Sequence, residues 1–341
     1  MMKYPVCIIL SFIFICIVSC DRSGSEITYP PLSPEKVFVK DNRLQGEYLS
    51  DSILNPYTLF HTQHGLIYVM SKGNYELLHM VDTLTAKEIA TCGRRGRGPG
   101  EFMGFLPYYY DWDKHRLYAA DVYKQQLWSF LISDKGIEQC GFSKLNRDIK
   151  ALATLNDSTF VFLTFFPYQT FGIMTKTCRE LTSMPYRIID REDIDYGKFA
   201  FSCALYLTPD KSKAVIIGST YASLRIYTLT GNKPELVCNY PFFEHHYDLA
   251  DEQPYAQDRN LRGREASCIT DNYVYIASYG KTVGEEVPAT ETYILVFNMK
   301  GEYVKTYYID KKICSMVVPR GDRVLYATVD DPEVYIVKFR L

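Results

Sequence analysis

The sequence predicts an all-β protein, a six-bladed β-propeller built from four-stranded antiparallel blades. The main evidence is an apolar, β-branched or tyrosine-rich run that occurs six times along the chain. Successive runs lie roughly 43 to 60 residues apart, which is the period expected of blades arranged around an axis. No helix-period segment of useful length interrupts the series, so we expect one domain over residues 35–341. The six runs are residues 66–70, 116–120, 159–164, 214–218, 273–278 and 323–328.

The second repeat shows how the strands of one blade follow each other. Residues 106–110, 116–120, 126–132 and 137–142 are predicted as its four strands, counted outward from the axis. Residues 111–114 and 134–136 contain the Asp and Gly typical of tight turns and connect them. Carboxylates recur at the equivalent inner turn of other repeats, and turn chemistry explains them without a calcium ion.

The final repeat is short of one strand, because the chain ends at Leu341 directly after the strand predicted over residues 333–340. An unpaired edge there would be an aggregation hazard and would leave the ring open. Val37, Phe38 and Val39 give residues 35–40 an apolar character that suits a strand. We therefore predict that this N-terminal segment closes the last blade as its fourth strand.

A short apolar segment near the N-terminus predicts export. Lys3 precedes an apolar stretch over residues 6–18, which is too short for an ordinary membrane span and is followed by small residues. Residues 17–20, Ile-Val-Ser-Cys, resemble the lipobox of bacterial lipoproteins. The resemblance implies a signal peptide over residues 1–19, a lipid on Cys20, and a place in the cell envelope, on the outer membrane or the periplasmic face. An uncleaved anchor and a plain signal peptide stay open as alternatives.

Composition sets limits on the partners. Residues 20–34 are polar and then proline-rich, which predicts a tether between the lipid and the folded domain, with the membrane as one partner. At 341 residues and 47% hydrophobic content the chain can bury a large core. Its formal net charge of -2 gives no electrostatic reason to expect nucleic acid as a partner.

The cysteines predict free thiols. Seven of the 10 lie beyond residue 20, and they are scattered singly in mostly apolar strand contexts. An odd number in such a pattern favours buried thiols over a disulfide framework. Cys203, Cys268 and Cys314 fall on predicted inner strands of neighbouring blades, so a bridge between two of them stays open.

A glycine-rich motif over residues 93–102 follows the predicted outer strand of the first blade, residues 88–92. Its glycines permit the backbone to cross to the next blade. Together with the strand that ends at Asp121, the motif resembles an NHL repeat. The lysine followed by Ser or Thr that a phosphate-binding loop needs is missing, so the crossing is the better interpretation. The residues assigned to this structural motif are Gly93, Arg97, Gly98, Pro99, Gly100, Glu101, Phe102 and Asp121.

Following a lipobox, the motif is also similar to bacterial envelope lipoproteins of the NHL-like or TolB-like six-bladed propeller family. The resemblance covers residues 88–136 and implies the six-bladed fold and an extracytoplasmic setting. It does not imply a reaction, because NHL-type propellers include lyases, sensor domains and binding platforms. The zinc-ligating histidines of the lyases have no matching set in this sequence.

Two sets of residues are candidate ligand contacts. The connection over residues 242–264 is longer than a propeller needs, and long connections often carry function, although a solvated insertion is the alternative. Adjacent histidines in an extended segment point to opposite sides, so no metal site is predicted there. Tyrosines on the inner strands would form a platform at the channel mouth. The candidates are Glu244, His245, His246 and Asp248 in the connection, and Tyr57, Tyr108, Tyr110 and Tyr206 on the strands.

These features predict a non-catalytic, lipid-anchored envelope propeller that binds a peptide, glycan or protein partner on one face of the ring. Neither a nucleophile-base constellation nor an H-E-x-x-H motif is present, and no cofactor is expected. The alternative is a metal-dependent envelope hydrolase or lyase with its site in the axial channel. Tightly held zinc or calcium in the purified protein would favour that alternative.

Overall fold

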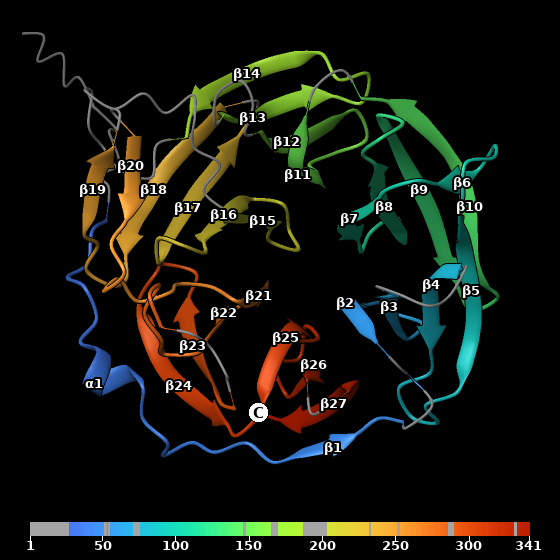
Figure 1. The fold of residues 1–341 in the computed structure, drawn as a ribbon. Coiled ribbons are helices and arrows are strands. Elements are labelled where there is room, and N and C mark those ends of the chain that lie inside the picture. The colour runs from blue at the N-terminus through green and yellow to red at the C-terminus, as the bar shows by residue number, and fades with distance from the viewer. Residues whose placement is uncertain are drawn as a thin grey trace, which may run out of the picture.

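The computed structural model describes residues 27–50, 53, 55–70, 76–145, 148–164, 170–186, 203–231, 233–250, 253–285, 290–330 and 333–341. In this part of the chain six sheets stand around a central axis (Figure 1). The prediction of a six-bladed propeller with four-stranded antiparallel blades is therefore confirmed. The predicted signal segment and Cys20 lie outside the described residues. None of the helices that the structure describes is long and apolar enough to span a membrane.

Blades one to three follow one another along the chain, and each runs from an innermost strand to an outermost one. Blade one gains a fifth strand of two residues, which pairs in parallel with its outer strand. Blade one contains β2 (Pro56–His61), β3 (Leu66–Met70), β4 (Glu76–Val81), β5 (Glu88–Arg95) and β6 (Glu101–Phe102); blade two contains β7 (Phe105–Asp111), β8 (Arg116–Asp121), β9 (Gln126–Ser133) and β10 (Gly136–Lys144); blade three contains β11 (Ile149–Thr154), β12 (Thr159–Thr164), β13 (Thr170–Thr175) and β14 (Glu180–Pro185).

Blades four to six complete the ring, and a two-stranded hairpin is inserted between blades four and five. Blade four contains β15 (Cys203–Leu207), β16 (Lys213–Gly218), β17 (Ser223–Thr230) and β18 (Lys233–Pro241); the hairpin contains β19 (Tyr247–Ala250) and β20 (Gln253–Ala256); blade five contains β21 (Ala266–Ile269), β22 (Tyr273–Ser278), β23 (Thr292–Asn298) and β24 (Tyr303–Ile309); blade six contains β25 (Lys312–Val317), β26 (Val324–Asp330), β27 (Val334–Arg340) and β1 (Gly46–Tyr48); the short helix α1 spans Pro34–Val37.

The six runs predicted from the sequence coincide with the second strands of the blades, β3, β8, β12, β16, β22 and β26. Every residue of β12 is buried, and in β16 every residue after Lys213 is buried. The reason is geometric, because a second strand has neighbours on both edges and a neighbouring blade against each face. A strand enclosed in this way becomes a continuous apolar run, without the alternation of a half-exposed strand.

The hydrophobic core lies in the wedges between neighbouring blades. Between blades five and six, Ile294 and Val296 of β23 belong to one cluster with Leu325 of β26 and Val337 of β27, and each is at most 1% exposed. Burying such a side chain contributes about 1.5–3 kcal/mol. Each blade therefore depends on both of its neighbours to bury its two faces.

The N-terminal segment 27–48, called the strap below, runs along the outside of blades four, five and six (Figure 1). At blade four the Ile27 N–H donates to the carbonyl of Val237 (3.0 Å). At blade five the Leu44 N–H donates to the carbonyl of Tyr308 (2.8 Å). The strap then continues as β1, the fourth strand of blade six. The strap covers the outer edges of these blades, which would otherwise expose unpaired backbone groups. Residues 27–34, which were predicted as part of the tether, lie against blade four.

The last blade is closed by an N-terminal strand, as predicted, but the assignment of that strand to residues 35–40 was wrong. Pro34 begins the helix α1 instead, since its fixed φ suits a first helical turn, and the Phe38 N–H donates to its carbonyl (2.9 Å). Val37 is 1% exposed and fills the wedge between blades four and five. The Phe38 ring packs edge-on against the ring of Tyr293, with ring centroids 5.1 Å apart.

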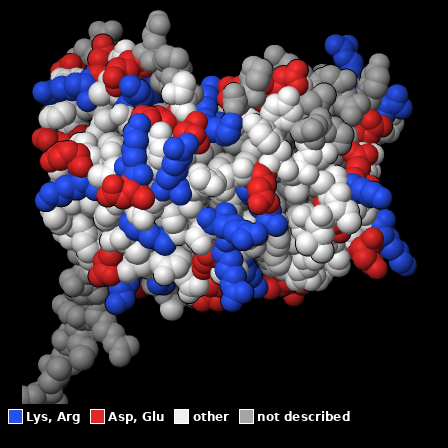
Figure 2. Space-filling model, turned by 90° about the horizontal axis from the view of Figure 1, so that it is seen from below, with Lys and Arg blue, Asp and Glu red and all other residues white. Residues whose placement is uncertain are grey.

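Charged side chains of both signs are interspersed over the perimeter seen in Figure 2. This mixture agrees with the formal net charge of -2. The face in this view has no single dominant sign of charge.

Gly46→Ala is expected to lower the free energy of unfolding by about 1–3 kcal/mol, because the closing strand leaves no room for a side chain there. A Cβ at this position would lie 2.4 Å from Val337 Cγ1 and 2.5 Å from Phe339 Cε1. Urea unfolding followed by circular dichroism measures the loss. Gly321→Ala is the matched control, since nothing lies within 4 Å of a Cβ at that position of the same blade. Equal stability of the two variants would contradict tight closure by β1.

Candidate functional site

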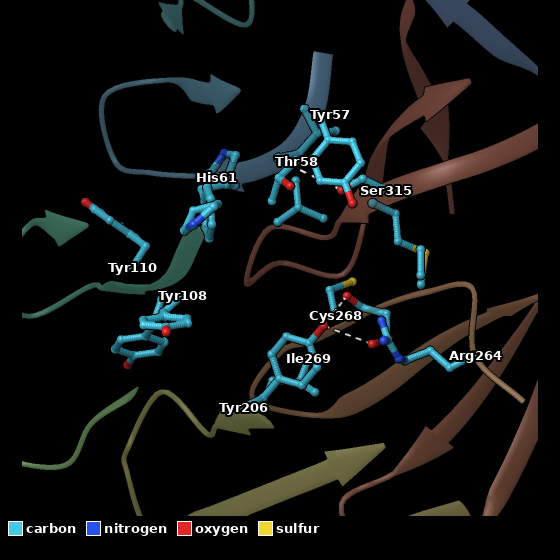
Figure 3. A pocket seen from close by; sticks show the side chains of 18 of the residues that line it. Tyr57, Thr58, His61, Tyr108, Tyr110, Tyr206, Arg264, Cys268, Ile269 and Ser315 are labelled. Carbon is cyan, nitrogen blue, oxygen red and sulfur yellow. Dashed lines mark hydrogen bonds between the residues drawn. The ribbon is translucent and has the colours of Figure 1, made fainter. Parts of the chain in front are cut away.

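The inner strands enclose a cavity of about 410 Å³ on the axis of the ring (Figure 3). Its lining comes from β2, β7, β15, β21 and β25, and from the segments directly before and after some of these strands. The four tyrosines predicted from the sequence all reach this cavity, although they are up to 149 positions apart in the chain. These are Tyr57, Tyr108, Tyr110 and Tyr206.

Irregular strand pairing aims several side chains at one level of the channel. Four of the six inner strands, β2, β7, β11 and β25, shift register against the second strand of their blade. A β-bulge of this kind inserts one residue and turns its side chain away from the regular alternation. Each inserted residue lies three or four positions before the end of its strand. The inserted residues are Tyr57, Tyr108, Lys150 and Cys314.

The four tyrosines differ in what they present to the cavity. Tyr57 is 64% exposed, and its ring hangs over the cavity in Figure 3. Tyr108 donates its hydroxyl to the carbonyl of Ile149 (2.5 Å), and burial raises its pKa, so it stays a neutral donor. Tyr206 donates to the carbonyl of Ser267 (2.6 Å).

Tyr110 makes a smaller contribution to the cavity than the other three tyrosines. Its side chain is 5% exposed and points away from the cavity centre in Figure 3. Its ring packs edge-on against Trp112, with centroids 5.6 Å apart. Tyr57 is therefore the predicted tyrosine with the most surface left for a ligand.

Hairpin turns close one end of the cavity. The Lys211 ammonium of blade four lies 3.1 and 3.2 Å from the Asp111 carboxylate of blade two. The Arg320 guanidinium of blade six lies over the Trp112 ring of blade two, 5.3 Å from its centroid. Neither pair joins adjacent blades, so both contacts cross the end of the channel. The opposite end, where Tyr57 and the exposed Cys314 lie, is the open end.

Arg264 brings a positive charge into the cavity. It lies directly before β21, and its Nε donates to Ser219 Oγ (3.1 Å). The preceding Gly263 passes so close to the loop between β16 and β17 that a Cβ would lie 2.5 Å from Ala222 Cα. The next residue, Glu265, also lines the cavity, and burial raises its pKa against the influence of nearby cations. Arg264 was not among the residues predicted from the sequence; its position at the end of a long connection into an inner strand was the available signal.

The predicted connection 242–264 contacts residues 281–284, which follow β22. The Val283 N–H donates to the carbonyl of Asn260 (2.8 Å), and the Gly284 N–H donates to the carbonyl of Asp258 (2.9 Å). Arg262 Nε donates to the carbonyl of Thr282 (3.2 Å). The end of the connection that leads to Arg264 is therefore held in place.

The other four candidates lie apart from the cavity, in and before the hairpin β19–β20. His245 is buried against Tyr221, with ring centroids 5.2 Å apart, and burial lowers its pKa to about 4. His246 Nε2 lies 3.8 Å from Glu244 Oε1. Asp248 accepts from an amide of the same hairpin, Nε2 of Gln257 (2.7 Å). Within the described ranges, no three His, Cys, Asp or Glu side chains are grouped so that they could hold a metal ion.

The glycine-rich motif forms the crossing from blade one to blade two. Asp121 is fully buried and accepts from the backbone N–H of Met103 (2.9 Å) and Gly104 (3.3 Å) and from two further N–H groups in its own turn. Glu101 accepts from the Gly98 N–H (2.8 Å). These carboxylates therefore accept hydrogen bonds from the backbone N–H groups that would have to be available to bind a phosphate.

Other residues of the motif serve this crossing. Gly93 and Gly100 have φ of 75° and 74°, the left-handed conformation that favours glycine. Phe102 is 1% exposed and packs against Phe105. Arg94 Nε lies 3.9 Å from Glu101 Oε1.

The seven cysteines that the structure describes form no disulfide with one another, and four of them are buried. Cys203, Cys268 and Cys314 lie on the inner strands β15, β21 and β25, as predicted, without a bridge between any two of them. Cys268 and Cys314 both line the cavity.

His61 lines the cavity, and its burial is expected to lower the stability of the folded protein at acidic pH. Its ring is stacked between Trp112 and Tyr326, and burial lowers its pKa from 6.5 to about 4. The unfolded chain therefore binds a proton between pH 6.5 and 4 that the folded chain does not, so the free energy of unfolding falls as the pH is lowered through this range. Urea unfolding at pH 7 and pH 5 is expected to show a smaller loss in His61→Phe than in the natural chain. An unchanged loss would contradict the assignment.

Comparison with known proteins supports the architecture. The family described as TolB-like 6-blade propeller-like matches residues 34–320. An exported protein of Bacteroides fragilis has a similar fold, with a TM-score of 0.60 and 12% identity over 92% of this chain and 99% of that one. A Bacteroides vulgatus member of the DUF4221 family follows with a TM-score of 0.56 and 14% identity over 88% and 99%. The β-propeller domain of Myceliophteria thermophila Cps50 has a TM-score of 0.51 and 11% identity over 83% and 97%.

At these identities the solved structures share the fold with this chain, and the comparison says nothing of a common activity. No curated protein matches the chain significantly. The family match is different, because it extends over most of the sequence, from α1 through blades one to five to β25 of blade six. The chain therefore belongs to the TolB-like six-bladed propeller family.

Proposed function

We propose that this protein is a non-catalytic, lipid-anchored propeller of the cell envelope that binds a peptide, glycan or protein partner at the open end of its axial cavity. One observation carries the proposal: the cavity is closed by cross-channel contacts at one end and presents Tyr57 and Arg264 at the other. Its volume of about 410 Å³ falls in the usual range of ligand sites, about 300–1,000 Å³.

The bulged inner strands support binding at this end. A bulge interrupts the strand ladder and redirects a side chain, and four inner strands have one at the same level. Three of the inserted residues, Tyr57, Tyr108 and Cys314, line the cavity from blades one, two and six. A ligand at this end could contact side chains from all three blades.

The envelope location rests on the N-terminal segment and the family. The apolar stretch over residues 6–18 and the lipobox-like end at Cys20 support export with a lipid anchor. The Bacteroides fragilis protein of similar fold is itself described as exported. The NHL-like glycine motif fits this setting, since it forms the crossing between the first two blades.

Tyr57→Ala is expected to weaken ligand binding by about tenfold, because it removes the most exposed ring at the open end. The full chain in detergent is applied to arrays of glycans and peptides, and affinities for the members that bind are then measured by calorimetry. His246→Gln is the matched control, since it changes the other predicted candidate set and leaves the cavity intact. Loss of binding in His246→Gln with full binding in Tyr57→Ala would move the site to the hairpin β19–β20 and contradict the proposal.

Cys20→Ala is expected to abolish lipid attachment, because the thiol of this residue would carry the lipid. Bacteria that express the full chain are grown with an alkyne-labelled fatty acid, and the label on the protein is detected after purification. Cys7→Ala is the control, since Cys7 lies within the apolar stretch. Label that persists in Cys20→Ala would contradict a lipid on this residue.

A further inference from the structure

We propose that the ligand of the axial cavity is an acidic saccharide, whose carboxylate is bound by the guanidinium of Arg264 and whose ring lies against Tyr57. This inference rests on the proposed function and names the ligand class for the same site. It follows from the geometry of Arg264, from the charges around it and from the shape of the surface beside it.

Two hydrogen bonds to Ser219 hold Arg264 in place, as expected of a residue that binds a ligand. Its backbone N–H donates to the carbonyl of Ser219 (3.3 Å), and its Nε donates to Ser219 Oγ (3.1 Å). The end of the guanidinium points toward the cavity centre in Figure 3. A guanidinium fixed at Nε still offers the N–H groups of its two terminal nitrogens, the planar fork that binds a carboxylate through two parallel hydrogen bonds.

The surroundings of Arg264 are more basic than acidic. The charged groups that act on the buried thiol of Cys203, on the neighbouring inner strand, are Arg264, Lys150 and Arg225, and all three are cations. Lys150 is the inserted residue of β11, the inner strand of blade three, and its side chain is exposed. An anion that enters between blades three and five therefore meets a positive field.

Glu265 is the acid that opposes this field within the cavity. The cations Arg262, Arg264 and Lys312 all act on its carboxylate, and burial raises its pKa. Its negative charge is therefore partly compensated by neighbours on blades five and six. Removing this charge should strengthen the binding of an anion, whereas removing the charge of Arg264 should weaken it. Substitutions of these two adjacent residues are therefore expected to change the affinity in opposite directions.

The rest of the open end suits a sugar ring. Tyr57 is 64% exposed, and such a ring offers a flat apolar face for the C–H groups of a pyranose. Ser267 and Ser315 add hydroxyls to the lining, and the cavity of about 410 Å³ has room for a small saccharide. Binding a carboxylate together with hydroxyls and an apolar face matches a uronic acid better than a simple inorganic anion.

The probes are trigalacturonate, its methyl ester and an acidic tripeptide of glutamates, each titrated into the full chain in detergent by calorimetry. Trigalacturonate is expected to bind at least tenfold more tightly than the ester, because one charge-assisted pair is lost on esterification. Arg264→Gln is expected to weaken trigalacturonate binding about tenfold and to leave the ester unchanged. Glu265→Gln is expected to tighten trigalacturonate binding severalfold, and Arg264→Lys should fall between Arg264→Gln and the natural chain.

Arg259→Gln is the matched control, since it makes the same charge change in the same connection at an exposed side chain outside the cavity lining. It should bind like the natural chain. Melting temperatures of all variants show whether a loss of binding reflects a loss of folding.

Three results would overturn the inference. Equal binding of the acid and its ester, with no effect of Arg264→Gln, would show a neutral ligand, and the proposed function would stand if Tyr57→Ala still weakened that binding. Binding of the tripeptide without trigalacturonate would show that the acidic ligand is not a saccharide. Failure of all three probes would exclude the acidic saccharide, while the array comparison of Tyr57→Ala with His246→Gln would decide the proposed function separately.

Discussion

Closure of the ring is the constraint on which the rest of this structure depends. Each blade has two apolar faces, and neither is buried unless a blade stands on either side. The pairing of β1 with β27 completes blade six, and the strap carries the chain to that point along the outer strands of blades four and five. The same closure fixes six inner strands around one axis, so the cavity and the geometry of its lining are consequences of it.

The periodic part of the fold was predictable because it is buried on both faces. The runs at residues 66–70, 159–164 and 273–278 match β3, β12 and β22 residue for residue. The closing strand was not predictable in the same way. Gly46, Glu47 and Tyr48 are all exposed, so β1 pairs through its backbone and its sequence has no apolar pattern. Val37 and Phe38 are apolar because they pack into the wedge between blades four and five, not because they form a strand.

Some residues of the candidate site could likewise be predicted from the sequence, and others could not. Inner-strand tyrosines could be selected from the sequence because tyrosine in that position faces the channel, and four of them do line one cavity. The bulges could not, since an inserted residue shifts the alternation on which a strand prediction relies. Tyr57 and Tyr108 were found in spite of their bulges because of their residue type, whereas Cys314 was not selected as a cavity residue. Arg264 was hidden for another reason: its role depends on Ser219, a contact across 45 positions that no local pattern records.

The strap also has a consequence for how this protein can fold. Gly46 pairs with Phe339, so the strand pairing that completes blade six joins two segments that are far apart in the sequence. Contacts so distant in sequence slow folding, because a long stretch of chain must be ordered before they form. Blades one to five lie between the two segments in the chain, and β1 has no partner until β27 is in place. Sealing of the ring is thus a step that needs both segments at once.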